Sequence, residues 1–178
     1  MSLKRFHLAG NVAGLFLLSV LFSITFYVQL AFHDLPCPLC LLQRIGFAGV
    51  GVAIVFNLSL EIRARHYGLM LLSALFGFAA AMRHLFLHIM PNDPGYGLPI
   101  FGLHMHTWSA LIFVLVMILG AIALVFDNGF HKVKTTMTVK SSMWLFMIML
   151  ALNAFSSLLE CGVDECPADP VVYQLLNW

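Results

Sequence analysis

Five long apolar stretches divide this chain of 178 residues, and they constrain its fold more than any other feature. They run from about residue 9 to 32, 41 to 60, 68 to 90, 108 to 126 and 142 to 159. About 20 apolar residues in a helix are enough to cross the roughly 30 Å hydrocarbon core of a membrane. Only 10% of the residues are charged, against about 25% in a soluble domain. The sequence therefore predicts an all-α integral membrane protein with five transmembrane helices.

The first apolar stretch follows Lys4 and Arg5, as the apolar part of a cleaved signal peptide would. It is too long for that segment, and no small-residue cleavage site leads into a polar sequence. We therefore expect a retained transmembrane helix. A single membrane domain, residues 1–178, is predicted, with a four-helix core at 1–130. Residues 131–178 would hold a cytoplasmic loop, the fifth helix and a cysteine-bearing tail.

The basic residues predict how the helices are oriented. With five crossings, all lysines and arginines except Arg44 and Arg83 fall in three segments on one side of the membrane. By the positive-inside rule that side is the cytoplasm, so the N-terminus is expected inside and the C-terminus outside. All four cysteines lie on the outer side, which is the oxidising, disulfide-forming compartment of a bacterial-type envelope. We therefore expect a multi-pass protein of the bacterial inner membrane with periplasmic cysteines.

Cys37 and Cys40 form a C-x-x-C pair at the start of the second apolar stretch. If Pro38 occupies the first turn of a helix, Cys37 lies at the helix N-terminus, where free N–H groups and the helix dipole favour a thiolate. Arg44 follows Cys40 by four residues and so shares its helix face. A pair with this spacing can also close a disulfide. The pattern predicts a redox-active dithiol beside a cation, with half of a zinc site or two buried thiols as the alternatives.

Further polar residues lie in the outer half of the predicted bundle. Arg83 is about two turns from the outer end of the third stretch, where an ionisable residue usually marks a functional site, although a snorkelling side chain is the alternative. His84 with His88, and His104 with His106, could bind a metal or haem, but hydrogen bonding at the interface is the more common role. No charge run, repeat or low-complexity segment occurs, and nothing indicates nucleic acid.

Cys161 and Cys166 lie in an acidic tail after the fifth stretch. Gly162 and Pro167 favour a tight turn there, and the negative charge disfavours a thiolate at either sulfur. The pair is predicted either to staple the tail or to exchange disulfides with a soluble partner and then with Cys37 and Cys40. The acidic residues on this side of the membrane are Asp34, Asp93, Glu160, Asp164, Glu165 and Asp169.

Residues 37–44, CPLCLLQR, resemble the C-x-L-C-x-x-[QE]-R motif of the disulfide bond formation protein B (DsbB) family of bacterial inner-membrane proteins. Residues 101–108, FGLHMHTW, resemble the segment that leads into the family's fourth helix, and Arg83 resembles an arginine of its third. The resemblance covers about residues 9–126. It implies an antiparallel four-helix bundle with a quinone pocket at its outer end, and the fifth helix would pack on its flank. Close packing is favoured by Gly46, Gly49 and Gly51.

The resemblance also implies an activity. The family takes electrons from a periplasmic thioredoxin-like (DsbA-type) dithiol protein and passes them to ubiquinone or menaquinone in the membrane lipid. By carry-over, Cys37 and Cys40 form the quinone-coupled disulfide, the Cys40 thiolate contacts the quinone, and Arg44 holds it. Arg83 and His88 are the further candidates for binding the cofactor, and no metal is expected.

The chain departs from the family pattern at the second cysteine pair. The family carries that pair in the loop between its third and fourth helices, where this chain has no cysteine. Here the second pair is Cys161 and Cys166, and their relay role is assigned from topology alone. Three alternatives remain. One is an enzyme similar to vitamin K epoxide reductase, whose quinone-coupled C-x-x-C lies on a late helix. The others are a haem-binding electron carrier and a scaffold with structural disulfides.

Overall fold

The computed structural model describes residues 3–32, 34–90, 93, 95–97, 99–126, 132–134, 136–162, 166–167, 170 and 172–176. Most of them lie in five helices: α1 (Leu3–Ala31), α2 (Pro38–Ser59), α3 (Ala64–Leu87), α4 (Met105–Val125) and α5 (Met137–Cys161). All five are long and apolar enough to cross a membrane. The described residues form no strand, so the predicted all-α fold with five membrane-spanning helices is confirmed.

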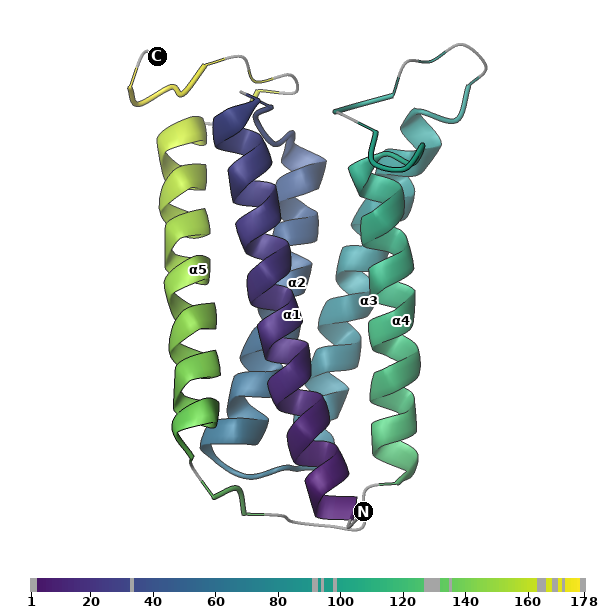
Figure 1. Ribbon diagram of the computed structural model, residues 1–178. Helices are drawn as coiled ribbons and strands as arrows, with labels where there is room; N and C mark the ends of the chain where they lie inside the picture. Colours follow the sequence, from purple (N-terminus) through teal and green to yellow (C-terminus); the bar gives the residue numbers. More distant parts are fainter. Residues whose placement is uncertain are drawn as a thin grey trace.

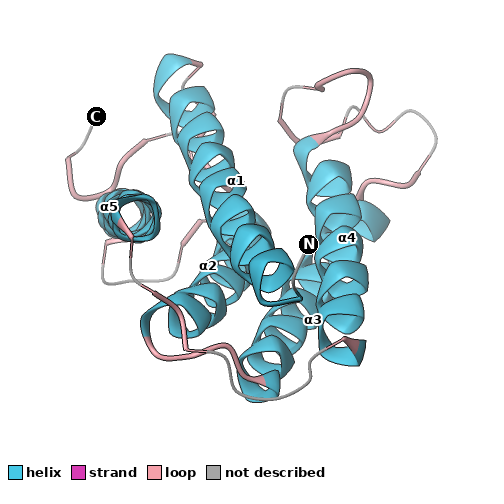
Figure 2. Cartoon of the chain, turned by 60° about the horizontal axis from the view of Figure 1, so that its bottom comes forward, coloured by secondary structure: helices cyan, strands magenta, loops and turns pink. Residues whose placement is uncertain are grey.

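The helices alternate in direction along the bundle (Figure 1). α2 packs most extensively against α3, and α3 against α4, whereas α5 lies on α1 and also contacts α2. Figure 2 shows α5 outside the group formed by the other four helices, on the flank where it was expected. The upper end in Figure 1 therefore gathers the start of α2 and the end of α5, the two segments that carry the cysteines.

Glycines allow the central helices to approach closely. A Cβ on Gly46 of α2 would fall 2.6 Å from the Cα of Gly77 in α3. The fully buried ring of Phe113 from α4 covers this contact, and a Cβ on Gly77 would overlap it. On the other side of α2, a Cβ on Gly51 would overlap the buried ring of Phe146 from α5. Small residues of α2 thus admit neighbours from three helices, as small residues do in membrane bundles.

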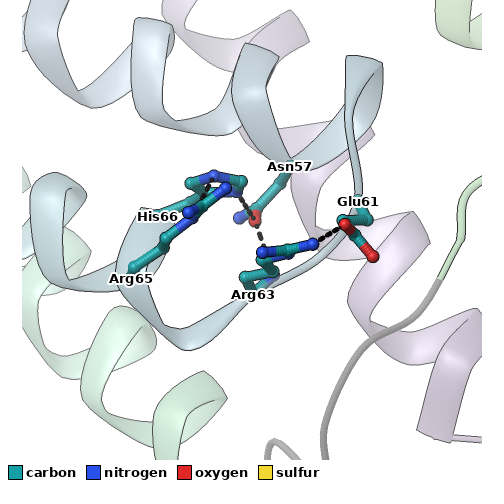
Figure 3. A network of polar contacts seen from close by, with 5 residues as sticks. All are labelled: Asn57, Glu61, Arg63, Arg65 and His66. Atoms are coloured by element: carbon teal, nitrogen blue, oxygen red, sulfur yellow. Dashed lines mark hydrogen bonds and ion pairs between the residues drawn. The ribbon is translucent and has the colours of Figure 1, made fainter.

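A polar network closes the end of the bundle opposite the cysteines (Figure 3). Asn57 Oδ1 accepts hydrogen bonds from the backbone N–H of Arg63 at 3.2 Å and from His66 Nδ1 at 3.1 Å. Arg65 Nε donates to His66 Nε2 at 3.3 Å, so the proton of His66 is on Nδ1. Arg63 also forms an ion pair with Glu61. These contacts hold the tight connection between α2 and α3 together.

Candidate active site

The N-terminus of α2 carries a dithiol. Cys37 is the N-cap residue, with φ −64° and ψ 163°, and Pro38 is the first helical residue, as predicted. The Cys37 sulfur accepts a hydrogen bond from the Cys40 backbone N–H at 3.2 Å, as a side-chain oxygen does at an ordinary N-cap. The Sγ atoms of Cys37 and Cys40 are 2.8 Å apart. A small movement would bring them to the disulfide bond length of about 2.0 Å.

The surroundings of Cys37 favour its thiolate. The hydrogen bond from the Cys40 side chain is the main cause that lowers the pKa of Cys37 to about 5; His84 and the Cys40 N–H add to it, and burial opposes it. His84 is 2% exposed, and both of its ring nitrogens lie 3.9 Å from Cys37 Sγ. Its Nδ1 is also 3.9 Å from Cys40 Sγ. These contacts favour Cys37 over Cys40 as the thiolate of the reduced pair.

A cavity of about 100 Å³ lies beside Cys40. Side chains of α1, α2, α3 and α4 and of the segments before α2 and α4 form its wall. Cys40 is among the lining residues and Cys37 is not, so a molecule in the cavity would meet the Cys40 sulfur. A mostly apolar wall with a few convergent polar groups is the usual form of a small-molecule site. The lining includes Cys40, Gln43, Arg44, Phe47, His84 and Trp108.

Side chains from two other helices hold Arg44 in place. Its Nη1 donates to Gln29 Oε1 of α1 at 3.0 Å and to Asn153 Oδ1 of α5 at 3.3 Å. Gln29 Nε2 in turn donates to Ser156 Oγ of α5 at 2.8 Å and to the hydroxyl of Tyr173 in the tail at 3.0 Å. The cation predicted from the sequence thus faces the cavity and is joined to α5 and the tail. Gln29, Asn153 and Ser156 were not predicted.

Arg83 of α3 and His88, the residue that caps its C-terminus, lie outside the cavity lining, although His84 is part of it. Arg83 is exposed and is not part of the cavity lining. Its predicted role in binding a cofactor therefore has no support from a contact with the cavity. The ring of His88 lies 5.3 Å from that of His84, and its Nδ1 is 3.0 Å from Asp93 Oδ1. The backbone N–H of Gly95, and then His88, hold the pKa of Asp93 below its usual range. His88 therefore contacts the cavity lining only indirectly, through the rings of His84 and His106.

The geometry of the site suits a dithiol better than a metal centre. Cys37, Cys40 and His84 place three potential ligand atoms within 4.8 Å of one another, the one such group in the described part of the chain. Zinc with Zn–S bonds of about 2.3 Å would hold two tetrahedral sulfur ligands about 3.8 Å apart, whereas these sulfurs are 2.8 Å apart. The outer histidine rings pack on one another at centroid distances of 4.5 to 5.9 Å instead of facing each other across a space for haem. These rings belong to His84, His88, His104 and His106.

The second cysteine pair lies at the same end of the bundle. Cys161 ends α5 and forms a disulfide with Cys166, with their Cα atoms 4.6 Å apart. Gly162 caps the helix at a φ of 66°, a conformation that glycine adopts without strain. The tail then returns over the helix end, where the Gln174 N–H donates to the carbonyl of Glu160 at 3.2 Å. The acidic residues Asp164, Glu165 and Asp169, which were expected to surround the pair, lie outside the described residues.

Comparison with known proteins identifies the family of this site. The profile of the family described as disulfide bond formation protein DsbB matches residues 9–96. Over these residues, the chain belongs to the DsbB family. Among curated relatives named disulfide bond formation protein B, one from Xylella fastidiosa is 33% identical over 90 residues, which are 48% of this chain and 52% of the relative. One from Pseudomonas syringae is 35% identical over 103 residues, 52% of this chain and 59% of the relative.

The DsbB match covers the dithiol but leaves out the C-terminal helices. It spans most of α1 together with α2 and α3, and so includes Cys37, Cys40, Arg44 and His84. It ends before α4, whereas the sequence motifs suggested a resemblance to about residue 126. The chain spans about half the length of the first of these curated relatives. No solved structure matches this chain.

Proposed function

We propose that the chain is a quinone-dependent membrane thiol oxidoreductase that reoxidises a periplasmic thioredoxin-like (DsbA-type) dithiol protein and so supports disulfide bond formation. The observation that carries the proposal is the position of the dithiol. Cys37 and Cys40 lie 2.8 Å apart at the N-terminus of α2, beside a cavity that Cys40 and Arg44 line. The DsbB membership of residues 9–96 supports the same conclusion.

The residues around the cavity fit a quinone, either ubiquinone or menaquinone. A quinone ring is flat and apolar, with carbonyl oxygens that accept hydrogen bonds. The wall offers the aromatic rings of Phe47 and Trp108 and the guanidinium of Arg44. When bound, a quinone supplies an acceptor for two electrons and two protons. Arg44 would hold a quinone oxygen, and its cation would stabilise negative charge leaving the Cys40 sulfur.

Electrons reach this dithiol by two thiol–disulfide exchanges. A thiolate of the reduced partner protein attacks the Cys161–Cys166 disulfide, and resolution of the mixed disulfide leaves the partner oxidised and the tail pair reduced. The tail thiols then reduce a Cys37–Cys40 disulfide in the same way. Each exchange breaks one S–S bond and forms another, so the electron pair is conserved. The position of both pairs at one end of the bundle supports this order.

The two sulfurs of the dithiol have different roles in the last step. Cys40 lines the cavity, so its electron pair leaves toward the acceptor there. Cys37, which is favoured as a thiolate, attacks the Cys40 sulfur and closes the disulfide. Over the step, the Cys37 thiolate and the Cys40 thiol together lose two electrons and one proton, and the acceptor takes its second proton from outside the pair.

We place this chemistry on the periplasmic face of a bacterial inner membrane. Arg63 and Arg65 lie at the end of the bundle opposite the cysteines, as do the described residues 132–134. The positive-inside rule would put that end in the cytoplasm. The cysteines would then face the oxidising compartment. A membrane-impermeant thiol reagent applied to intact spheroplasts should label Cys161 and Cys166 after mild reduction, and labelling that required lysis would reverse this orientation.

The test of the function is quinone reduction by the purified protein, with a reduced thioredoxin-like dithiol protein as the electron donor. The wild type should turn over, and Cys40→Ala and Cys161→Ala should both be inactive. Loss of activity in Cys40→Ala alone would retain the oxidase but make the tail disulfide a structural staple. A folded wild type that reduces no quinone would contradict the proposal.

A further inference from the structure

Glu160 is a buried carboxylic acid within a membrane-spanning helix. It is 0% exposed, and neither carboxyl oxygen has a hydrogen-bond partner among the described residues. A buried carboxylate without partners is costly, so such a group normally balances a nearby charge or holds a proton. Glu160 also directly precedes Cys161 of the tail disulfide. The reaction proposed above leaves this group without a role.

The ionisable groups that face Glu160 come from the start of α2. The Arg44 guanidinium and the Cys37 thiol both lie close enough to interact with it electrostatically. Glu160 is therefore within electrostatic range of both the cation and the favoured thiolate of the redox site. The ionisable groups around Arg44 itself are Cys40, Glu160, Tyr173 and Asp34.

The position of Glu160 follows from the pattern of α5. Asn153, Ser156 and Glu160 recur at intervals of three and four residues, so they lie on one face of the helix. The first two reach the Arg44 network, because Asn153 accepts from Arg44 and Ser156 accepts from Gln29. This polar stripe in an apolar helix brings the Glu160 carboxyl to the same network.

Arg44 and Cys37 act on Glu160 in opposite ways, because the cation favours the carboxylate and a Cys37 thiolate disfavours it. The described hydrogen bonds of Arg44 go to the neutral amides of Gln29 and Asn153, so the cation still requires an anion. When Cys37 and Cys40 form a disulfide, neither sulfur is charged and the Glu160 carboxylate can balance Arg44. When they are reduced, Cys37 becomes a second anion within electrostatic range of Glu160. Two like charges repel more strongly in a low-dielectric interior than in water, which favours a proton on one of them.

We propose that Glu160 holds the second proton of the reduced site. When the Cys37–Cys40 disulfide takes up two electrons and two protons, one proton binds the Cys40 sulfur, the other binds the Glu160 carboxyl, and Cys37 remains a thiolate. On oxidation the S–S bond forms again, and the two protons leave from Cys40 and Glu160. They match the two protons that a quinone takes up. Glu160 is a positioning residue, because it acts through Arg44 and the charge on Cys37. The inference rests on the proposed function only for the identity of the acceptor.

Infrared difference spectroscopy of the quinone-free, full-length protein tests this proposal. In a Cys161→Ser/Cys166→Ser background only Cys37 and Cys40 change between the oxidised and reduced states. Reduction should produce the C=O band of a protonated carboxylic acid and remove a carboxylate band. Glu160→Gln should abolish both signals, Glu160→Asp should keep them at shifted frequencies, and the matched control Glu61→Gln, at the opposite end of the bundle, should leave them unchanged. A spectrum without a carboxyl signal, or a signal that survives in Glu160→Gln, overturns the proposal.

The pH dependence of the equilibrium with glutathione gives a second readout. Glutathione disulfide binds two protons when it is reduced, and so should the wild-type site, so their equilibrium constant should hardly change between pH 6 and 8. Glu160→Gln should bind one proton fewer, and its constant should change about tenfold per pH unit. A structural role for Glu160 would shift the constant without changing its pH dependence, and that result also overturns the proposal. Neither measurement involves a quinone, so failure of the proposed activity would leave both results interpretable.

Discussion

Replacement of His84 by alanine should raise the pKa of Cys37. The ring nitrogens of His84 lie 3.9 Å from Cys37 Sγ, and His84 helps to lower the pKa of Cys37 to about 5 through a hydrogen bond and its charge. The larger cause is Cys40, which the variant keeps, so we expect a rise of about 1 unit, or ~1.4 kcal/mol. At pH 5 the thiolate fraction of Cys37 then falls from about one half to about one tenth. At pH 7 it falls only from about 99% to about 91%, so the effect appears only in acid.

The assay is the rate of Cys37 alkylation in the reduced protein, measured from pH 4 to 8 and resolved by peptide mass spectrometry. The midpoint of the rate profile should move from about pH 5 to about pH 6 in His84→Ala. His88→Ala is the matched control, because the His88 ring contacts His84 but its Nδ1 is bonded to Asp93. Its midpoint should stay at the wild-type value. An unchanged midpoint in His84→Ala, or a wild-type midpoint near that of a free cysteine, would refute this account of the thiolate.

Three further predictions concern stability. The pKa of Cys37 is about 5 in the folded protein, below its unfolded value of about 8.5. The thiolate therefore adds to the stability of the folded protein fully above the unfolded pKa, and this stabilisation is lost as the pH falls toward 5. The Tm of the reduced wild type should therefore rise from pH 5 to 8 relative to reduced Cys37→Ser, and parallel curves would contradict this. The added methyl of Gly77→Ala would overlap the Phe113 ring, so this variant should lower the free energy of unfolding in detergent by about 1–3 kcal/mol. The added methyl of Gly10→Ala meets nothing within 4 Å, so that variant should unfold like the wild type. Asn57→Ala removes the acceptor of the Arg63 N–H and of His66, and should lower the free energy of unfolding by about 1–3 kcal/mol. Ser59→Ala, at an exposed position, should lower it by about 0.5 kcal/mol or less. Equal losses in the two variants would argue against the network.

The number and order of the helices were predictable, because crossing hydrocarbon requires a long apolar run that local composition records. The ends of the helices were less predictable. α1 begins at Leu3 and α5 at Met137, each five or six residues before the expected apolar stretch. Hydropathy locates the apolar part of a helix, whereas the polar first turns, with Arg5 in α1 and Lys140 in α5, continue beyond it. Which end faces the cytoplasm remains a prediction from the basic residues.

The candidate site was predictable where it depends on spacing along one helix. The C-x-x-C pair, Pro38 at the first helical position and Arg44 one turn further on are local features of α2. Arg83 and His84 show the limit of this reasoning. Successive residues of a helix differ by about 100° in direction, and in an almost uniformly apolar helix no periodicity shows which direction faces the bundle. The structure directs His84 to the cavity and leaves Arg83 exposed.

Contacts between helices account for the rest of the site, and α5 is the element on which they depend. This helix lies outside the DsbB match, yet it supplies Asn153 to Arg44, Ser156 to Gln29 and the buried carboxyl of Glu160. A buried cation is stable only when polar partners replace its lost hydration. Without α5, Gln29 would remain as the one described hydrogen-bond partner of Arg44. The helix that ends at Cys161 of the tail disulfide therefore also stabilises the cation beside the dithiol, so the two cysteine pairs are connected through Arg44 and α5.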